Sequence, residues 1–415
     1  MAEPAPLRVL LAGGGSAGHV NPLLATATDL AARPGGATIT VLGTEAGLEA
    51  RLVPAAGLPL RIVPRVPLPR RPSPDLLRLP ARLTAAVRAA RAAITESGAE
   101  VVVGFGGYVS TPAYLAARAA GVPVVVHEQN ARPGLANRRG ARWARAVAVT
   151  FPSTPLPGGQ RTGMPLRTGI ANRPGARWAR AVAVTFPGTP LPGGQLTGMP
   201  LRAGIAALLA ERATPELAAA RRRAGAAALG LDPARTTLLV TGGSLGAQRV
   251  NEAASACAGD LVGAGVQVLH LTGAGKDAAV ADAVAAAGAG EHYHVRPYLD
   301  AMEHAYACAD LVLARSGAGT VSELAALGIA AVYVPLPIGN GEQRLNATGV
   351  VDAGGGLLVE DADLTAALVR SHVVPLLADR ARLTAMGEAA AAAGVRDGAA
   401  RLGDLVLAAA GRGAA

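Results

Sequence analysis

Residues 310–347 place the strongest limit on what this chain can fold into. Within them, a short apolar run at 311–314 predicts a buried strand, a glycine-containing loop follows, and a helix is expected from about 320 to 327. A second apolar run, at 329–334, predicts the next strand. Strand, loop, helix and strand form a βαβ unit, which joins parallel strands. Open sheets of this kind bind ligands at the carboxyl ends of their strands, where this loop would lie.

The start of this helix allows two roles for one acidic side chain. Thr320 and Glu323 have the spacing of a capping box, and Gly328 ends the helix. The loop before the helix is built from small residues, and the amino end of a helix favours an anion. Glu323 therefore either caps the helix or contacts a ligand.

Two further apolar runs, at 7–12 and 236–240, also lead into glycine loops and helices. After the first loop we expect Asn21 to cap a helix that begins at Pro22. The loop has the glycine spacing of a dinucleotide-binding site, but Glu45 lies too late to be the acid which that site requires. The pattern predicts two Rossmann-like domains with parallel sheets and disfavours NAD binding.

Length and charge narrow the function. A chain of 415 residues can form two domains of ordinary size. Its net charge of +10 favours an anionic membrane or a phosphorylated ligand, whereas 3% aromatic residues and the lack of a basic run argue against nucleic acid. Asp361 and Asp363 form an Asp-x-Asp sequence, which binds metal in some proteins, but we interpret them as part of a solvated turn. We expect neither a metal nor a cofactor.

Several features indicate the compartment. Cys257 and Cys308 lack metal-binding spacing and are interpreted as buried thiols in a reducing environment. The first apolar run is too short for a signal peptide, and no stretch has the length and apolarity of a spanning helix. Between residues 65 and 91, leucines alternate with arginines, which predicts either an ordinary surface helix or a patch on an anionic membrane.

Residues 136–170 and 171–205 are nearly identical copies of one segment. Repeat architectures need about three or more stacked units, so we interpret the pair as a tandem duplication. Both copies end in Gly-Met-Pro-Leu-Arg, which makes Arg167 and Arg202 equivalent. The first copy is continuous with the motif at 127–130 and the second with the following domain, so the sequence leaves open which copy completes the first domain.

Motifs along most of the chain resemble the MurG family of glycosyltransferases. They are, in order, GGGSAGHVNP, GFGGYVSTP, HEQNARPGLAN, RSGAGTVSE and GEQRLNA. The resemblance implies a GT-B fold, in which two Rossmann-like domains with parallel sheets face a central cleft. It implies inverting transfer of N-acetylglucosamine from UDP-N-acetylglucosamine to the 4-hydroxyl of undecaprenyl-pyrophosphoryl-N-acetylmuramoyl-pentapeptide, at the cytoplasmic face of the cell membrane. Departing UDP would be stabilised by loop amides and arginine, so a metal is not required.

The resemblance also implies the donor site. Glu323 would bind the ribose hydroxyls, Leu299 would hold uracil through backbone groups, and Gln343 with Glu342 would meet the sugar hydroxyls. The other implied donor residues are Ser16, Asn130, Arg167, Arg202, Ser244 and Arg315.

On the acceptor side, the resemblance makes His19 the favoured general base. A histidine with a pKa near neutrality suits removal of a hydroxyl proton. The alternative for His19 is a polar cap residue, and Glu128 either orients loop amides or is a second candidate for base or acceptor contact. The implied acceptor contacts are Gly14, Gly15, Gly18, His19, Tyr108 and Asn137.

We expect four segments in the chain. These are an acceptor- and membrane-facing domain in 1–170, the second copy in 171–205, a donor-binding domain in 206–375 and C-terminal helices in 376–415. Two rival functions stay open. One is another UDP-sugar enzyme of this fold, transferase or epimerase, and the other is a nucleotide-binding scaffold impaired by the duplication.

Overall fold

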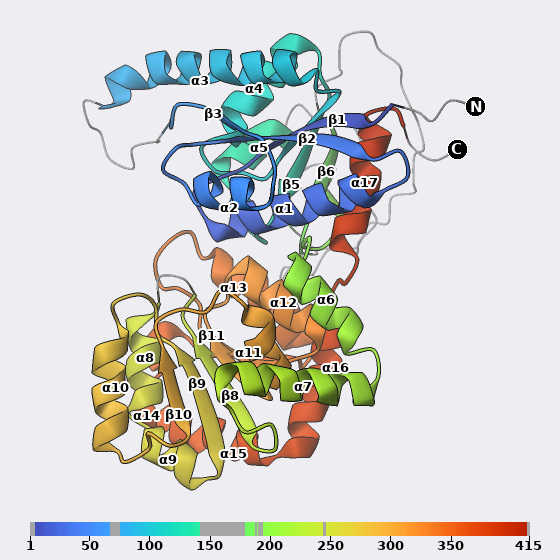
Figure 1. Cartoon of the computed structure of the whole chain (residues 1–415). Helices are drawn as coiled ribbons and strands as arrows, with labels where there is room; N and C mark the ends of the chain where they lie inside the picture. The colour runs from blue at the N-terminus through green and yellow to red at the C-terminus, as the bar shows by residue number, and fades with distance from the viewer. Residues whose placement is uncertain are drawn as a thin grey trace, which may run out of the picture. The chain divides into compact units, whose positions relative to one another are not determined.

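The computed structural model describes residues 5–66, 75–141, 179–186, 189, 194–243 and 246–412. The chain divides into a first unit, Met1–Arg202 with Asp397–Ala415, and a second unit, Ala203–Arg396. In each unit helices cover a parallel sheet (Figure 1). The prediction of two α/β domains with parallel sheets is confirmed.

The sheet of the first unit has the order β3-β2-β1-β4-β5-β6-β7, and all neighbouring strands are parallel. Its strands are β1 (Leu7–Ala12), β2 (Ala37–Gly43), β3 (Leu60–Ile62), β4 (Val101–Gly104), β5 (Val124–Glu128), β6 (Ala179–Val184) and β7 (Gly194–Leu196). The order reverses between β1 and β4. The loops that follow these two strands therefore begin side by side at the carboxyl edge of the sheet.

The first helix, α1 (Ala17–Ala32), begins earlier than predicted. We expected Asn21 as N-cap and Pro22 at the first helical position, but Pro22 lies inside the helix. The N-cap is Ser16, whose backbone is extended (φ −138°, ψ 157°), and its carbonyl accepts from the amide of His19 (3.1 Å). Serine and asparagine are both favoured N-cap residues, and here the helix begins directly after Ser16, the earlier of the two. His19 therefore lies in the first turn of a helix.

The other helices of the first unit are α2 (Glu49–Ala55), α3 (Asp75–Ser97), α4 (Ser110–Ala120), α5 (Leu135–Ala141) and α17 (Gly398–Ala409). The C-terminal helix α17 packs on α1, where Arg33 donates to Asp404 (2.6 Å) and to Asp29 (2.7 Å). Among the helices that the structure describes, none combines the length and the apolar composition needed to cross a membrane.

The second unit contains a six-stranded parallel sheet in the order β10-β9-β8-β11-β12-β13. Its strands are β8 (Thr236–Thr241), β9 (Val266–Leu271), β10 (Tyr293–Arg296), β11 (Leu311–Ala314), β12 (Ala330–Tyr333) and β13 (Gly356–Leu358). Its helices are α6 (Ala203–Glu211), α7 (Pro215–Leu229), α8 (Gln248–Ser255), α9 (Ala258–Gly263), α10 (Asp277–Ala286), α11 (Met302–Cys308), α12 (Ala318–Leu327), α13 (Glu342–Asp352), α14 (Ala366–Leu368), α15 (Val374–Ala378) and α16 (Arg380–Ala393). The order again reverses between adjacent strands, here β8 and β11.

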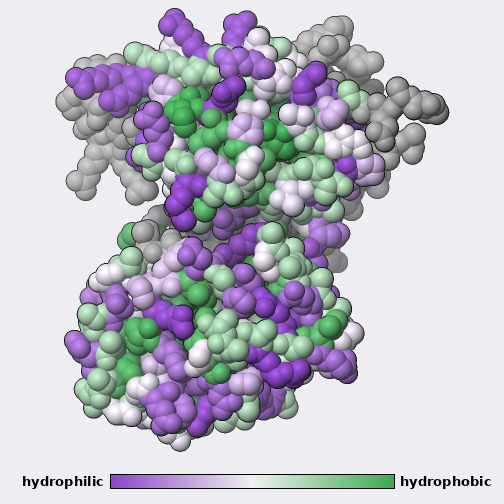
Figure 2. Space-filling view, viewed as in Figure 1, coloured by the Kyte–Doolittle hydropathy of each residue, from purple (hydrophilic) through white to green (hydrophobic). Residues whose placement is uncertain are grey.

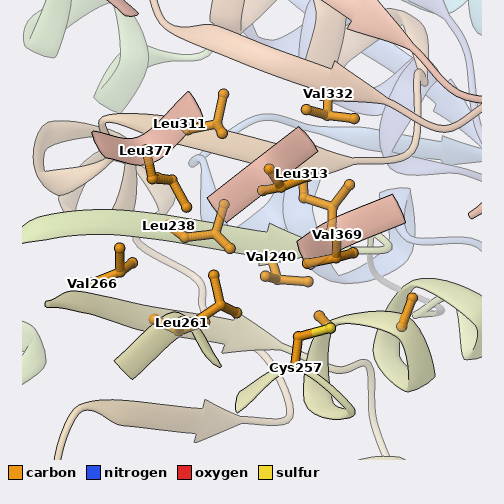
Figure 3. Packing of buried hydrophobic residues seen from close by; sticks show 14 of the residues in the cluster. Leu238, Val240, Cys257, Leu261, Val266, Leu311, Leu313, Val332, Val369 and Leu377 are labelled. Carbon is orange, nitrogen blue, oxygen red and sulfur yellow. The ribbon is translucent and has the colours of Figure 1, made fainter. Parts of the chain in front are cut away.

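The core of the second unit lies between the sheet and its covering helices. Leu238 and Leu311, on the paired strands β8 and β11, are fully buried, and Leu377 of α15 and Val369 belong to the same cluster (Figure 3). Burial of each such side chain contributes about 1.5–3 kcal/mol. The strands therefore hold the loops at their carboxyl ends in fixed positions.

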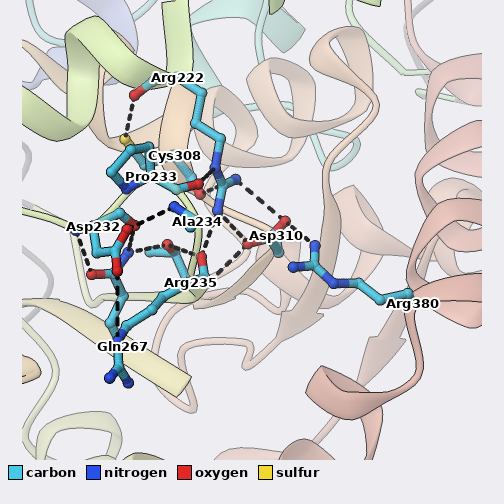
Figure 4. Close-up of polar contacts among 10 residues, drawn as sticks. Arg222, Asp232, Pro233, Ala234, Arg235, Gln267, Cys308, Asp310 and Arg380 are labelled. Atoms are coloured by element: carbon cyan, nitrogen blue, oxygen red, sulfur yellow. Dashed lines mark hydrogen bonds and ion pairs between the residues drawn. The ribbon is translucent and has the colours of Figure 1, made fainter. Parts of the chain in front are cut away.

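Asp310 connects strand β8 with helices α7 and α16 at the amino edge of this sheet (Figure 4). It accepts hydrogen bonds from the amide of Thr237 (2.8 Å), from Arg222 (2.9 Å) and from Arg380 (3.0 Å). Arg222 also donates to the carbonyl of Cys308 (2.7 Å). Because this edge is opposite the carboxyl ends of the strands, we assign the cluster to stability. Both cysteines of the chain are free and buried, as predicted.

The second copy of the repeat supplies the last two strands of the first sheet. β6 pairs with β5 in the register Val126 to Val182, and Met199 and Leu201 after β7 are buried. The equivalent strand of the first copy, at 144–149, lies outside the described residues. The first copy supplies α5 instead, so the described domain combines the helix of one copy with the strands of the other.

Candidate active site

Two glycine loops meet at the edge of the first sheet. Gly107, after β4, has a φ of 78°, and a Cβ there would come within 2.6 Å of the carbonyl oxygen of Gly14 in the loop after β1. Only glycine combines this conformation with so close an approach. The hydroxyl of Ser110 accepts from the amide of Gly106 (2.8 Å) and donates to the carbonyl of Ala12 (3.0 Å), which joins the two loops.

His19 is held between these loops. Its Nδ1 lies 3.1 Å from the hydroxyl of Ser16, and its ring approaches Gly106, where a Cβ would be 3.2 Å from Nε2. Burial lowers the pKa of His19 below its usual value, against the backbone of Gly14 and the negative charge of Glu49, which both raise it. His19 is therefore mostly neutral at pH 7 and able to accept a proton. Ser16, rather than His19, is the N-cap of α1.

A pocket opens beside the first glycine loop. Its lining residues are Gly14, Gly15, Thr44, Ala46, Gly47, Glu49, Arg65, Tyr108 and Val109. The guanidinium of Arg65 lies 5.1 Å from the centre of the Tyr108 ring, which is 40% exposed. A cation stacked on an aromatic ring at the mouth of a pocket offers both charge and a flat apolar surface to a ligand.

Glu49 was missed by the sequence analysis. Its carboxylate is fully buried and accepts from the amide of Gly15 (2.8 Å), the amide of Thr44 (3.0 Å) and the hydroxyl of Thr44 (2.7 Å). These bonds lower its pKa although burial raises it, so the group is ionised. Thr44 directly follows β2, which pairs with β1, so the strand order brings Glu49 to the first glycine loop. The amide of Gly15, one of the predicted acceptor contacts, therefore donates to Glu49.

Glu128 and Asn137 lie inside the first unit. Glu128 is 2% exposed and accepts from the amides of Asn130 (2.9 Å) and Gly134 (3.0 Å) and from the side chain of Asn137 (3.0 Å). Asn137 also donates to the carbonyl of His127 (3.0 Å) and is 2% exposed. Burial raises the pKa of Glu128 and these bonds lower it. The geometry favours the loop-orienting role for Glu128 and does not support acceptor contact by Asn137.

In the second unit, Glu323 lies beneath the loop after β11. It is 8% exposed, and its Oε2 accepts from the hydroxyl of buried Tyr306 on α11 (3.2 Å). The predicted capping box is wrong, because α12 begins at Ala318 with Gly317 as N-cap and no side chain caps it. Thr320 lies within the helix rather than before it. The structural alternative for Glu323 therefore loses its support.

Arg315 crosses the same edge of the sheet. It donates to the carbonyls of Val334 (3.3 Å) and Pro335 (3.1 Å) and pairs with Asp361 (2.6 Å). Asp361 is only 14% exposed and also pairs with Arg249 (3.2 Å). The interpretation of Asp361 as a solvated turn is therefore wrong; its ion pairs hold the loop that follows β12. Among the described residues, no cluster of histidine, cysteine and carboxylates suits a metal ion.

The remaining predicted donor residues are placed as follows. Gln343, in the first turn of α13, accepts from the amide of Leu336 (3.1 Å), and Glu342 accepts from the amide of Asn340 (3.2 Å). Leu299 is partly buried in the loop after β10. Arg202 is partly buried at the end of the second copy, whereas Arg167 and Ser244 lie outside the described residues.

Comparisons with known proteins agree with this architecture. Residues 9–149 match the glycosyltransferase family 28 N-terminal domain and residues 237–402 match its C-terminal domain. A Nocardioides protein called UDP-N-acetylglucosamine–N-acetylmuramyl-(pentapeptide) pyrophosphoryl-undecaprenol N-acetylglucosamine transferase is 51% identical over 97% of this chain and 98% of its own length. A Clavibacter sepedonicus protein of the same name is 50% identical over 96% and 95%. The crystal structure of Acinetobacter baumannii MurG is 26% identical, with a TM-score of 0.69 over 97% of this chain and 100% of that one.

Proposed function

The chain belongs to glycosyltransferase family 28, and we propose that it transfers N-acetylglucosamine from UDP-N-acetylglucosamine to the muramoyl sugar of undecaprenyl-pyrophosphoryl-N-acetylmuramoyl-pentapeptide. The observation that carries this function is identity of about one half with relatives of that name over nearly the whole of both chains. The match spans both domains, which disfavours an enzyme that shares only a donor half. The product is a precursor of peptidoglycan, so the protein serves cell wall synthesis.

His19 is the general base in this proposal. Its lowered pKa leaves the imidazole neutral at pH 7, and the glycine backbone around it leaves room for a sugar hydroxyl. The base takes the proton of the 4-hydroxyl while that oxygen attacks the anomeric carbon and the bond to UDP breaks. One displacement inverts the anomeric carbon. Glu128 takes the loop-orienting role, because its carboxylate accepts from the amides of Asn130 and Gly134 and from the side chain of Asn137 on α5.

The second unit holds the donor. Glu323 offers a carboxylate that accepts hydrogen bonds from the two ribose hydroxyls, and Gln343 and Glu342 at the start of α13 offer the groups for the sugar. The amino ends of α8 and α12 both follow strands at the reversal of the sheet, where they favour a diphosphate. Arg315, paired with Asp361, keeps the β12 loop in place by donating to the carbonyls of Val334 and Pro335.

The pocket of the first unit receives the acceptor. Tyr108 and Arg65 at its mouth present an aromatic face and a positive charge, which suit a sugar ring and a phosphate respectively. Arg65 was not predicted from the sequence. Its position between the end of β3 and the start of α3 brings it beside Tyr108 only in the folded unit.

A membrane surface completes the proposal, because the acceptor carries a lipid. In α3, Arg78 is exposed and Leu79 and Leu83 are partly buried. Hydrophilic residues project from the edge of the first unit where α3 runs (Figure 2). Arginines of this kind meet anionic head groups while neighbouring leucines enter the interface. The protein would lie on the cytoplasmic face of the cell membrane.

Transfer of label tests the function. Purified protein is incubated with radiolabelled UDP-N-acetylglucosamine and a synthetic lipid-linked muramoyl-pentapeptide, and label is counted in the lipid phase. Transfer is the expected result. Binding of UDP-N-acetylglucosamine without transfer would support the scaffold alternative. That alternative assumed that the duplication impairs the first domain, whereas the second copy supplies β6 and β7 of its sheet.

A further inference from the structure

Glu49 is a buried carboxylate under the first glycine loop, and neither the proposed reaction nor the sequence motifs account for it. It begins α2, and its residue is 0% exposed. Gly14, Gly43 and Gly47 make room for it, because a Cβ at any of these positions would overlap its side chain. Three glycines around one carboxylate form a socket shaped for this side chain.

The carboxylate is charged inside this socket. Both of its oxygens accept hydrogen bonds, Oε1 from the amide and hydroxyl of Thr44 and Oε2 from the amide of Gly15. Among the described residues, no lysine or arginine forms an ion pair with it. Burying a charge without a counterion is costly, so hydrogen bonds alone keep the negative charge in place. A buried carboxylate held at such cost beside a proposed site is a candidate for a role in that site.

Glu49 is connected to His19 through residues 15 and 16. The Gly15 amide, fixed by Glu49, is followed directly by Ser16, whose hydroxyl lies 3.1 Å from Nδ1 of His19. The negative charge of Glu49 also acts on the imidazole through space. The other groups that approach the ring, from Ser16 and from Gly106 and Gly107 in the loop after β4, carry no charge.

We propose that Glu49 is a positioning residue for His19. Its carboxylate fixes the turn that orients the imidazole, and its charge stabilises the imidazolium that forms when His19 takes the acceptor proton. This inference rests on the proposed function for the proton transfer, whereas the link between the two residues rests on the contacts of Gly15 with Glu49 and of Ser16 with His19. Groups that orient a catalytic histidine and offset its positive charge commonly alter its basicity in this way.

The experiment compares Glu49→Gln with Glu45→Gln. Glu45 is exposed on the same loop, so its variant removes an equal charge without touching the socket. In Glu49→Gln the pKa of His19 falls, because the imidazolium loses its negative neighbour. The C2 proton of His19, assigned with His19→Gln, is followed by NMR between pH 4 and 8 in protein without substrate. The expected result is a titration moved to lower pH in Glu49→Gln and unmoved in Glu45→Gln.

Kinetics supply the second readout. Glu49→Gln is expected to lower kcat on the order of tenfold and to move the acidic limb of the kcat profile to lower pH, with the KM for UDP-N-acetylglucosamine unchanged. If Glu49→Gln does not fold, Thr44→Val is measured instead, because it removes the 2.7 Å hydrogen bond from the Thr44 hydroxyl to Glu49. That bond lowers the pKa of Glu49, so its loss makes Glu49 easier to protonate. The titration of His19 should then move to lower pH, as in Glu49→Gln.

A His19 titration that is identical in wild type and Glu49→Gln, or in wild type and Thr44→Val where the first variant is unfolded, overturns the proposal. A shifted titration with no transfer by the wild-type protein would instead overturn the proposed function and leave the coupling intact.

Discussion

The hydroxyl of Tyr306 on α11 donates a hydrogen bond to the Glu323 carboxylate on α12 across 3.2 Å, and both side chains are buried. The bond does two things for Glu323. It compensates part of the cost of removing a carboxylate from water, and it limits the directions in which that carboxylate can point. Tyr306 therefore aligns Glu323 for the ribose hydroxyls in the proposed donor site.

Tyr306→Phe removes this hydrogen bond. Hydrogen bonds to charged groups are worth about 1.5–3 kcal/mol, so we expect the KM for UDP-N-acetylglucosamine to rise about tenfold or more, with a smaller change in kcat. Steady-state kinetics with varied donor at saturating acceptor measure this. Tyr333→Phe is the matched control, since the buried Tyr333 hydroxyl has no partner among the described residues. Equal donor KM values in both variants would contradict the role of Tyr306.

Glu323→Ala separates donor binding from helix capping. Because the cap of α12 is Gly317 and no side chain caps this helix, we expect the donor KM to rise on the order of tenfold or more. Thermal unfolding is recorded beside the kinetics. A lower melting temperature with an unchanged donor KM would restore the capping interpretation and remove Glu323 from the donor site.

The strands and the loops between them could be predicted because this sheet architecture has a simple signature. The runs at 7–12 and 311–314 match β1 and β11 to the residue, since each is mostly apolar and buried and is followed by a glycine or a polar residue. The glycine loops followed from those strands. Local patterns were therefore enough to place the two sheet edges at which we propose that ligands bind.

Contacts across the chain could not be predicted in the same way. The bond from Gly15 to Glu49 exists because β2 lies beside β1, and it joins residues 34 positions apart. Asn137 belongs to a motif that resembles an acceptor contact, but its side chain turns inward to Glu128 and Tyr114. A motif gives the type of side chain, and only packing decides which way it faces.

His19→Ala tests the base. We expect kcat to fall by about 10²–10⁴-fold, because proton removal by a positioned base contributes that much, while donor affinity measured by calorimetry stays the same. In the wild type, the lowered pKa of His19 predicts that activity declines only below about pH 6.5. His372→Ala, at an exposed position of the second unit, is the control. Unchanged turnover in His19→Ala would exclude His19 as the base.

Buried His127 predicts a loss of stability in acid. Burial lowers its pKa to about 4, and its ring contacts the carbonyl of Gly198 (3.2 Å) and the amide of Gln129 (3.0 Å). Between about pH 6.5 and 4 the unfolded chain binds a proton that the folded protein does not, so stability falls as pH falls through this window. The loss is up to about 3 kcal/mol. Thermal unfolding from pH 7 to 4 measures it, and His127→Gln should flatten the curve in this range; an equally steep curve in that variant would contradict the assignment.

The duplicated segment gives the sharpest test of the fold. The described first unit uses α5 from the first copy and β6 and β7 from the second, and within one copy the residues that correspond to Ala141 and Ala179 are separated by only an arginine and a tryptophan. Deletion of residues 142–176 therefore joins α5 to β6 with the spacing of a single copy and removes no residue of a described element. We expect this variant to fold and to transfer N-acetylglucosamine to the lipid-linked acceptor at least as fast as the full chain. Deletion of 177–211 is the comparison of equal length: it removes β6, β7 and α6, so it should yield insoluble or inactive protein. An inactive 142–176 deletion beside an active full chain would show that the first copy does more than lengthen the connection between a helix and a strand.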